Sequence, residues 1–200
     1  MLKRDEIHWF PLRIRHSNAS RLLRLQTLLE EEPGVERTFI PMRYKKVSDQ
    51  KMDFAPAIDN LLFIRITYDD LSRIKEKKAL YEPIRYIMHP VLEPDNTEHS
   101  EVLYVADAMM NDFIRVSSEE SDKVVWLDNL DFACKPSQAV QITEGQFAGV
   151  KGRIKRIQGN VCVVIPIEQT AAVAIRNLPR KYLRYLSEEE STPLYSNDRH

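Results

Sequence analysis

The sequence predicts two domains of different class: an N-terminal α+β domain of sheet and helices, followed by a small all-β barrel of the SH3-like kind. In the first two thirds of the chain, segments with period-two apolar residues alternate with helix-periodic segments. Four of the five glycines fall within the fifteen residues 145–159. The charge also changes sign: residues 47–134 hold 9 basic and 18 acidic side chains, whereas residues 135–186 hold 9 and 2.

This change of charge, beside Pro136, predicts the domain boundary. We expect a first domain over residues 1–132, a second over 133–186, and an acidic tail over 187–200 that lacks apolar periodicity and frays. The alternative is a charged loop inside a single domain.

The first domain is expected to begin with a strand over residues 7–15, in which Phe10, Leu12 and Ile14 share one face. Ser17 or Asn18 is then expected to cap a helix that ends before Pro33. Further strands are predicted over 36–44, 61–67, 84–88 (stopped at Pro90) and 102–105. Further helices are predicted from 67 or 69 to 77 and over 106–116, with Met110, Phe113 and Ile114 on the inner side of the second. The short connections favour an antiparallel or mixed sheet.

The strand over 61–67 has no polar face. Leu62, Ile64 and Ile66 form one apolar face of this strand. Leu61 and Phe63 lie on the other face, together with Arg65. Trp9 in the first strand likewise points away from its apolar neighbours. Either helices cover both faces of the sheet, or Trp9, Leu61 and Phe63 form an exposed apolar patch that binds a partner; the pattern alone favours burial.

The second domain holds the most specific motif in the chain. Glycine supplies positive φ or close backbone approach at barrel corners, and Gly159-Asn160 between two β-branched runs predicts a hairpin turn. Strand, glycine corner, strand, hairpin and strand, followed by 171–175, predict a five-stranded barrel. Its own side chains fill the interior of so small a barrel, so it presents a surface to partners rather than a catalytic pocket.

Residues 141–165, with the pattern Gly145-x-Phe147-x-Gly149-x-x-Gly152-x-Ile154, resemble the KOW motif of NusG-family transcription elongation factors. The N-terminal half resembles the NusG N-terminal domain on Trp9-Phe10-Pro11-Leu12 and on Phe39-Ile40-Pro41. Residues 105–116 resemble the last helix of that domain in specialised, operon-specific members. Together these similarities cover about residues 7–183.

The resemblance implies that the first domain binds the clamp helices of the largest RNA polymerase subunit. Leu61 stands where the family has a tyrosine, after Asp59-Asn60 rather than Pro-Gly or Pro-Ser, and Phe63 holds the following aromatic position. Ile58 lies at the edge of the implied pocket. The resemblance therefore favours a partner surface for Leu61 and Phe63. Trp9 belongs to the same face, but core packing remains its favoured role and partner binding the alternative.

The implied function is transcription elongation or antitermination: a factor that suppresses pausing or termination and recruits a partner through its KOW domain. That partner is implied to be a small-subunit ribosomal protein or the termination factor Rho. The implied contact residues are Gly145, Phe147, Gly149, Val150 and Gly152. The divergent third strand and the acidic tail favour a specialised paralogue. The alternative is an RNA-binding or ribosome-associated KOW protein, against which the pI of about 6.5 argues.

A basic group near the first helix is a candidate nucleic-acid site, for non-template DNA or nascent RNA. It comprises Arg13, Arg15, Arg21 and Arg24. The alternative is a solvated helix face. The basic residues between 151 and 156 allow the same two interpretations, RNA phosphates or solvent.

Other functional classes lack their signatures. The five histidines are scattered and the two cysteines stand apart from other ligands, so no metal site and no cofactor is expected. No nucleophile elbow or dinucleotide fingerprint occurs, and we expect no enzyme activity. No apolar run reaches the length of a membrane span, and the two cysteines favour the reducing cytoplasm.

Overall fold

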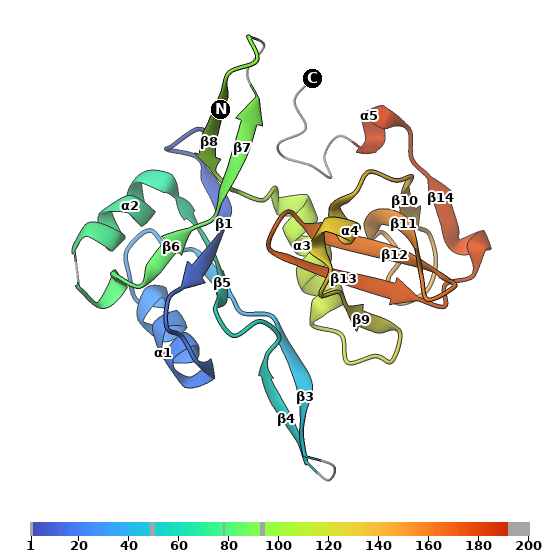
Figure 1. Ribbon diagram of the computed structural model, residues 1–200, viewed down its shortest axis with the longest axis horizontal. Helices are drawn as coiled ribbons and strands as arrows, with labels where there is room; N and C mark the ends of the chain where they lie inside the picture. Colours follow the sequence, from blue (N-terminus) through green and yellow to red (C-terminus); the bar gives the residue numbers. More distant parts are fainter. Residues whose placement is uncertain (1, 49–50, 78, 93–94, 192–200) are drawn as a thin grey trace. The chain divides into compact units, whose positions relative to one another are not determined.

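The computed structural model describes residues 2–48, 51–77, 79–92 and 95–191. The chain divides into two compact units, Met1–Val105 and Ala106–His200, and each combines helices with strands (Figure 1).

The first unit is built on an antiparallel four-stranded sheet with the order β2-β5-β1-β6. The strands are β1 (Ile7–Ile14), β2 (Arg37–Phe39), β5 (Leu61–Thr67) and β6 (Ile84–Tyr86). β1 pairs with β5 from Ile7 opposite Thr67 to Arg13 opposite Leu61. The predicted strands over 7–15 and 61–67 are therefore confirmed.

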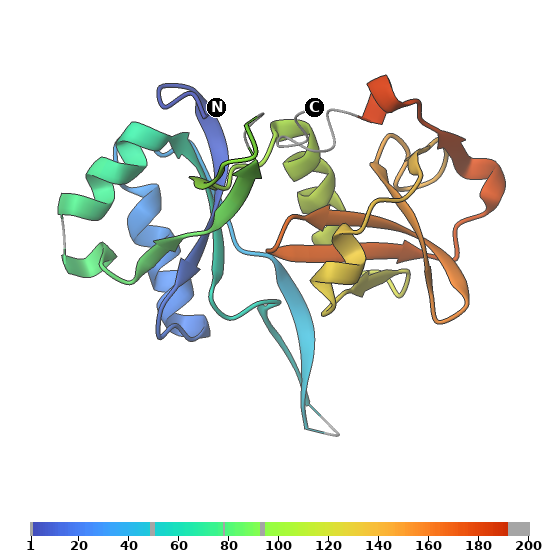
Figure 2. The same cartoon turned by 45° about the horizontal axis from the view of Figure 1, so that its top comes forward.

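Helices α1 (Ala19–Glu30) and α2 (Tyr68–Lys77) both contribute to the core on one face of this sheet (Figure 2). The Asn18 side chain accepts a hydrogen bond from the Arg21 N–H and caps α1, as expected. The Thr67 hydroxyl accepts from the Asp70 N–H at the start of α2. The core of this face is formed by alternate residues of β1 and β5 together with the apolar stripes of both helices: Phe10, Leu12, Ile14, Leu22, Leu25, Leu29, Leu62, Ile64, Ile66, Leu71 and Ile74.

Two hairpins depart from the expected strands. The strand predicted over 36–44 is divided into β2 and β3 (Met42–Ser48), and β3 pairs with β4 (Lys51–Pro56), which was not predicted. Pro90 does not stop a strand: it lies inside β7 (Met88–Leu92), which pairs with β8 (Glu98–Val102). A proline is tolerated here because both strands of a two-stranded ribbon are edges. Of the strand expected over 102–105, Val102 is the last residue of β8 and Val105 forms an isolated bridge with Trp9.

The second unit is built on a six-stranded sheet with the order β14-β10-β11-β12-β13-β9. Its strands are β9 (Val124–Trp126), β10 (Ala139–Ile142), β11 (Lys151–Ile157), β12 (Asn160–Ile167), β13 (Ala171–Arg176) and β14 (Leu183–Tyr185). Within the described part of the chain, no pairing joins β14 to β9, so the strand pairings do not close this sheet into the expected five-stranded barrel.

Residues 106–132 group with the second unit, whereas the sequence places the boundary near residue 133. β9 extends the sheet by pairing with β13, with Val124 opposite Ile175. Phe113 of α3 (Asp107–Ser117) meets the Trp126 ring edge-on, with ring centroids 6.0 Å apart. Met110 and Phe113 are buried, as predicted, and Ile114 is half-buried. The long-range pairing of β9 with β13 has no local sequence signal.

The remaining elements are short. They are α4 (Leu130–Cys134), the 3-10 turns η1 (Ala79–Tyr81) and η2 (Arg180–Tyr182), and α5 (Glu188–Ser191) in the predicted tail. The rest of that tail, 192–200, lies outside the described residues. Among the residues that the structure describes, no helix has both the length and the apolar character to cross a bilayer.

The glycines of the second unit serve two different purposes. Gln158 and Gly159, with φ of 49° and 81°, form the two-residue turn between β11 and β12, because Ile157 pairs with Asn160. The turn is thus one residue earlier than the predicted Gly159-Asn160. Gly152 instead lies against β12: a Cβ there would be 2.7 Å from both Val163 Cγ1 and the Val164 carbonyl oxygen.

Gly152→Ala is therefore expected to destabilise the second unit by about 2–3 kcal/mol, because backbone on β12 would have to move. Gly159→Ala is the matched control: its Cβ would meet nothing within 4 Å, and only the positive φ opposes it, at about 1 kcal/mol. Urea unfolding followed by circular dichroism measures both. Equal losses in the two variants would contradict the close approach.

Candidate nucleic-acid interface

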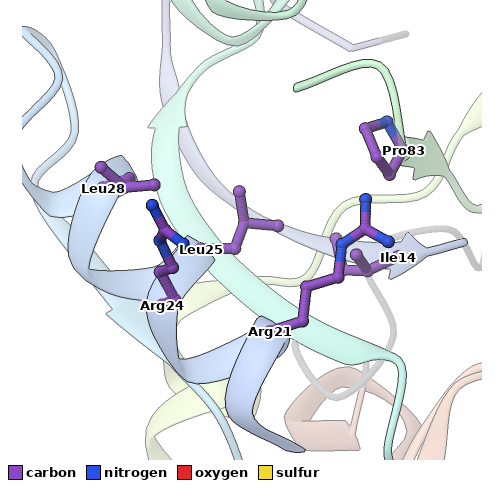
Figure 3. Close-up of a pocket in the computed structure, with 6 residues that line it drawn as sticks. All are labelled: Ile14, Arg21, Arg24, Leu25, Leu28 and Pro83. Carbon is purple, nitrogen blue, oxygen red and sulfur yellow. The ribbon is translucent and has the colours of Figure 1, made fainter. Parts of the chain in front are cut away.

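A small pocket lies on the first unit between α1 and the ends of two sheet segments (Figure 3). Its volume is about 170 Å³, which is below the roughly 300–1,000 Å³ of pockets for drug-sized ligands. The lining combines two guanidinium groups with aliphatic side chains: Ile14, Arg21, Arg24, Leu25, Leu28 and Pro83. The space suits one flat ring or one phosphate group.

Helical spacing explains how α1 lines this pocket. Arg21, Arg24, Leu25 and Leu28 follow one another at intervals of three, one and three residues, so they share one face of the helix. Leu25 is buried beneath the two arginines, which are both exposed. The opposite wall is held by a backbone hydrogen bond of 2.9 Å from the Arg15 N–H to the Pro83 carbonyl.

The pocket is electropositive. The Arg21 guanidinium, which points towards Pro83 in Figure 3, donates to the His16 carbonyl at 3.2 Å. Within the described residues, neither Arg21 nor Arg24 has a carboxylate partner. Two guanidinium groups over an aliphatic floor can bind a phosphate through N–H donors and stack a flat ring.

The four arginines singled out in the sequence do not form one cluster. Arg13 lies on the other face of β1 from Ile14, and its Nη1 donates to Asn60 Oδ1 at 2.8 Å. Burial lowers the pKa of the Arg13 guanidinium. Arg15 is exposed beyond the end of β1. The structure therefore brings Arg21 and Arg24 together, and it adds Ile14 and Pro83, which no local pattern connects to α1.

Most of the side chains implied to bind polymerase are buried. Leu61 and Phe63 have 0% exposed surface and Trp9 has 1%, whereas Ile58 is half-buried. Within the first unit, the Phe39 ring lies 6.3 Å from that of Phe63, and both α1 and α2 contribute to the core on the opposite face. Ile58 is therefore the one of these four residues with appreciable exposed surface.

The loop of the KOW pattern is partly core and partly surface. Phe147 is 3% exposed and Val150 0%, so both pack inside the second unit. Gly145 and Gly149 have φ of 83° and 93°, and both are exposed. The residues on which a partner could bind are therefore the exposed stretch 143–146 and Gly149 rather than Phe147 and Val150.

Helix α3 holds this loop from within the second unit. The Arg115 guanidinium donates to the carbonyls of Gln146 at 2.6 Å and Ala148 at 2.8 Å. The Asp112 carboxylate accepts from the Lys151 N–H at 3.0 Å. Burial raises the pKa of the Asp112 carboxyl above its ordinary value of 3.8, against smaller opposing effects of that hydrogen bond and of the Arg115 and Lys151 charges.

The basic residues of β11 are largely engaged by their own unit. The Lys155 ammonium is buried and donates to the Lys135 carbonyl, and burial lowers its pKa. Arg153 Nη1 donates to the Ser137 carbonyl at 2.9 Å. Arg156 is exposed. The hypothesis of an RNA-binding stripe on β11 is therefore weakened.

No group of three or more histidine, cysteine, aspartate or glutamate side chains comes together as a metal site among the residues described above.

The half-buried Asp112 carboxyl predicts a pH dependence. A carboxyl whose pKa is raised by folding contributes stability that is present below its unfolded pKa and is lost as the pH rises through its folded pKa. Asp112→Asn keeps an acceptor for the Lys151 N–H and does not titrate. We therefore expect the variant to gain stability relative to the natural chain as the pH rises from below to above the ordinary carboxyl pKa of 3.8. Thermal unfolding across that range measures the difference; a constant difference would contradict the burial.

Neither a family model nor a curated protein matches the sequence. Among solved structures, the chain is similar to one titled "Domain interaction in Thermotoga maritima NusG", with 14% identity and a TM-score of 0.42. The alignment covers 92% of this chain and 100% of that chain.

Proposed function

We propose that this chain is a NusG-type transcription elongation or antitermination factor, a specialised paralogue that acts on particular operons. The observation that carries the proposal is the KOW pattern in residues 141–165, together with the backbone at its glycines. Gly145 and Gly149 adopt positive φ, and Gly152 leaves no room for a Cβ. The glycine pattern therefore agrees with the local backbone geometry, which supports the proposal.

In this proposal the first unit binds the clamp helices of the largest RNA polymerase subunit through Ile58, Leu61, Phe63 and Trp9. Because three of these four side chains are buried, binding selects a conformation that exposes them. The segment of α2 then bridges towards the opposite side of the polymerase cleft. Bridging favours the closed clamp and so reduces the population of paused states.

The KOW loop recruits a second partner, a small-subunit ribosomal protein or Rho. The exposed part of the loop, at 143–146 and Gly149, offers backbone groups and the Glu144 and Gln146 side chains. Because α3 holds the same loop through Arg115, a bound partner would meet a preorganised surface.

The pocket at Arg21 and Arg24 supports a second contact, with a single strand of non-template DNA or nascent RNA. The two exposed guanidinium groups supply the phosphate contacts, and the aliphatic floor supplies apolar area for a base.

Polymerase binding is tested on the one half-buried residue of the proposed face. Ile58→Asp is expected to weaken co-purification with core RNA polymerase at least about tenfold, or about 1.4 kcal/mol, because a carboxylate would be desolvated in an apolar contact. Leu23→Asp on α1, at 40% exposure, is the matched control and should bind normally. Phe63→Asp is unsuitable because it would bury a charge in the folded protein.

Absence of binding by the unmodified chain, or equal binding by both variants, would refute the proposed polymerase surface. Circular dichroism of each variant distinguishes a lost surface from a lost fold.

The arginine pocket is tested by its salt dependence. Arg21→Ala/Arg24→Ala is expected to lower the slope of log K against log salt by about 0.7 for a single-stranded oligonucleotide, because the contacts to the one phosphate that the pocket accommodates are lost. Arg180→Ala/Lys181→Ala, which removes two exposed cations from η2 of the second unit, should leave the slope unchanged. Fluorescence anisotropy at several salt concentrations measures both; equal slopes would exclude the pocket.

A further inference from the structure

The hairpin of β3 and β4, hereafter the finger, projects from the sheet of the first unit in both views (Figures 1 and 2). Among the described strands, β3 and β4 pair only with each other. The base of the finger is held by a 2.7 Å hydrogen bond from the Ala57 N–H to the Pro41 carbonyl. A 2.7 Å ion pair between Lys45 and Asp59 holds it as well. The finger is therefore anchored at one end and solvated along its outer part.

One face of the finger carries a ladder of large side chains. Tyr44 lies directly opposite Phe54, and Lys46 lies directly opposite Met52. Because side chains alternate along a strand, these two cross-strand pairs share one face. Tyr44 and Phe54 are each 52% exposed and Met52 is 56% exposed. The two aromatic rings lie 5.1 Å apart between centroids.

The exposed side chains on this face of the finger are not part of the hydrophobic core of the first unit. The innermost residues of the same ladder do pack inwards: Pro56 is buried, and Met42 packs against the core of the first unit. Two residues further out, the ladder leaves this core and its aromatic side chains are exposed. Two neighbouring aromatic rings and a methionine held in water by a two-stranded hairpin indicate a binding face.

Charge indicates what the face binds. Residues 42–56 hold four basic and two acidic side chains, although the longer stretch 47–134 is strongly acidic. Lys46 stands on the same face as the rings. Aromatic rings beside cations bind single-stranded nucleic acid: bases stack on the rings, and the cations meet the phosphates.

We propose that the finger is a stacking platform for unpaired bases of single-stranded nucleic acid. Tyr44 and Phe54 stack the bases, and the net positive charge of residues 42–56 attracts the phosphate backbone. This site is separate from the arginine pocket, which α1 and Pro83 line, and it does not depend on polymerase binding or on the KOW loop.

The test uses the full chain and a single-stranded oligonucleotide that carries 2-aminopurine, a base whose fluorescence responds to stacking. The natural chain is expected to change that fluorescence and to bind at low salt. Tyr44→Ile/Phe54→Ile is expected to weaken binding about tenfold or more and to abolish the fluorescence change, because flat rings are lost while β-branched residues preserve the hairpin. Tyr44→Phe should bind normally, since stacking does not need the hydroxyl.

Two control variants separate the finger from other sites. Tyr185→Ile removes another exposed aromatic ring, at 63% exposure on β14, and should leave binding unchanged. Arg21→Ala/Arg24→Ala should retain the fluorescence change of the finger even where it weakens overall affinity. RNA and DNA probes of the same sequence determine which backbone the finger prefers.

The proposal is overturned if the natural chain binds neither probe, or if Tyr44→Ile/Phe54→Ile binds as the natural chain does. Sedimentation that reveals self-association dependent on Tyr44 and Phe54, without nucleic-acid binding, would instead assign the face to a second copy of the chain. Because these measurements contain no polymerase, failure of the finger and failure of the proposed transcription function are distinguishable.

Discussion

The antiparallel pairing of β1 with β5 is the constraint on which the first unit depends. Phe10 opposite Ile64 and Leu12 opposite Leu62 face the core that α1 and α2 share. The same register turns Trp9 and Phe63 to the other face. Since side chains alternate with period two, a slip of one residue would exchange the two faces. The pairing also places Asn60 beside β1, where it accepts from Arg13 and, through its carbonyl, from the Ile14 N–H.

The candidate sites of the first unit differ in how they relate to this sheet. The arginine pocket is built on the covered face, where α1 crosses the end of β1, and it is open to solvent. The other face holds Leu61 and Phe63, whose side chains have no exposed surface. The finger lies outside both faces and is exposed without any change. Binding at the pocket and at the finger thus needs no opening of the protein.

In the second unit, the loop of the KOW pattern depends on α3. Arg115 satisfies two loop carbonyls, and Asp112 satisfies the Lys151 N–H at the start of β11. Phe147 and Val150 are thereby part of a core, while the glycines and polar residues form the surface. The motif therefore combines a structural and a surface part, and the apolar residues belong to the structural part.

The sequence was sufficient to predict the elements that neighbouring residues determine. These are the alternation in β1 and β5, the Asn18 cap of α1, the apolar stripe of α3 and the glycines of the KOW loop. It was insufficient wherever distant segments meet. The pairing of β9 with β13 and the meeting of Pro83 with α1 leave no periodic pattern, because each depends on chain segments far apart in the sequence. The sequence of the strand did not determine whether Leu61 and Phe63 are buried, because a strand with two apolar faces has the same pattern whether its second face is buried or exposed. Only tertiary packing decided it.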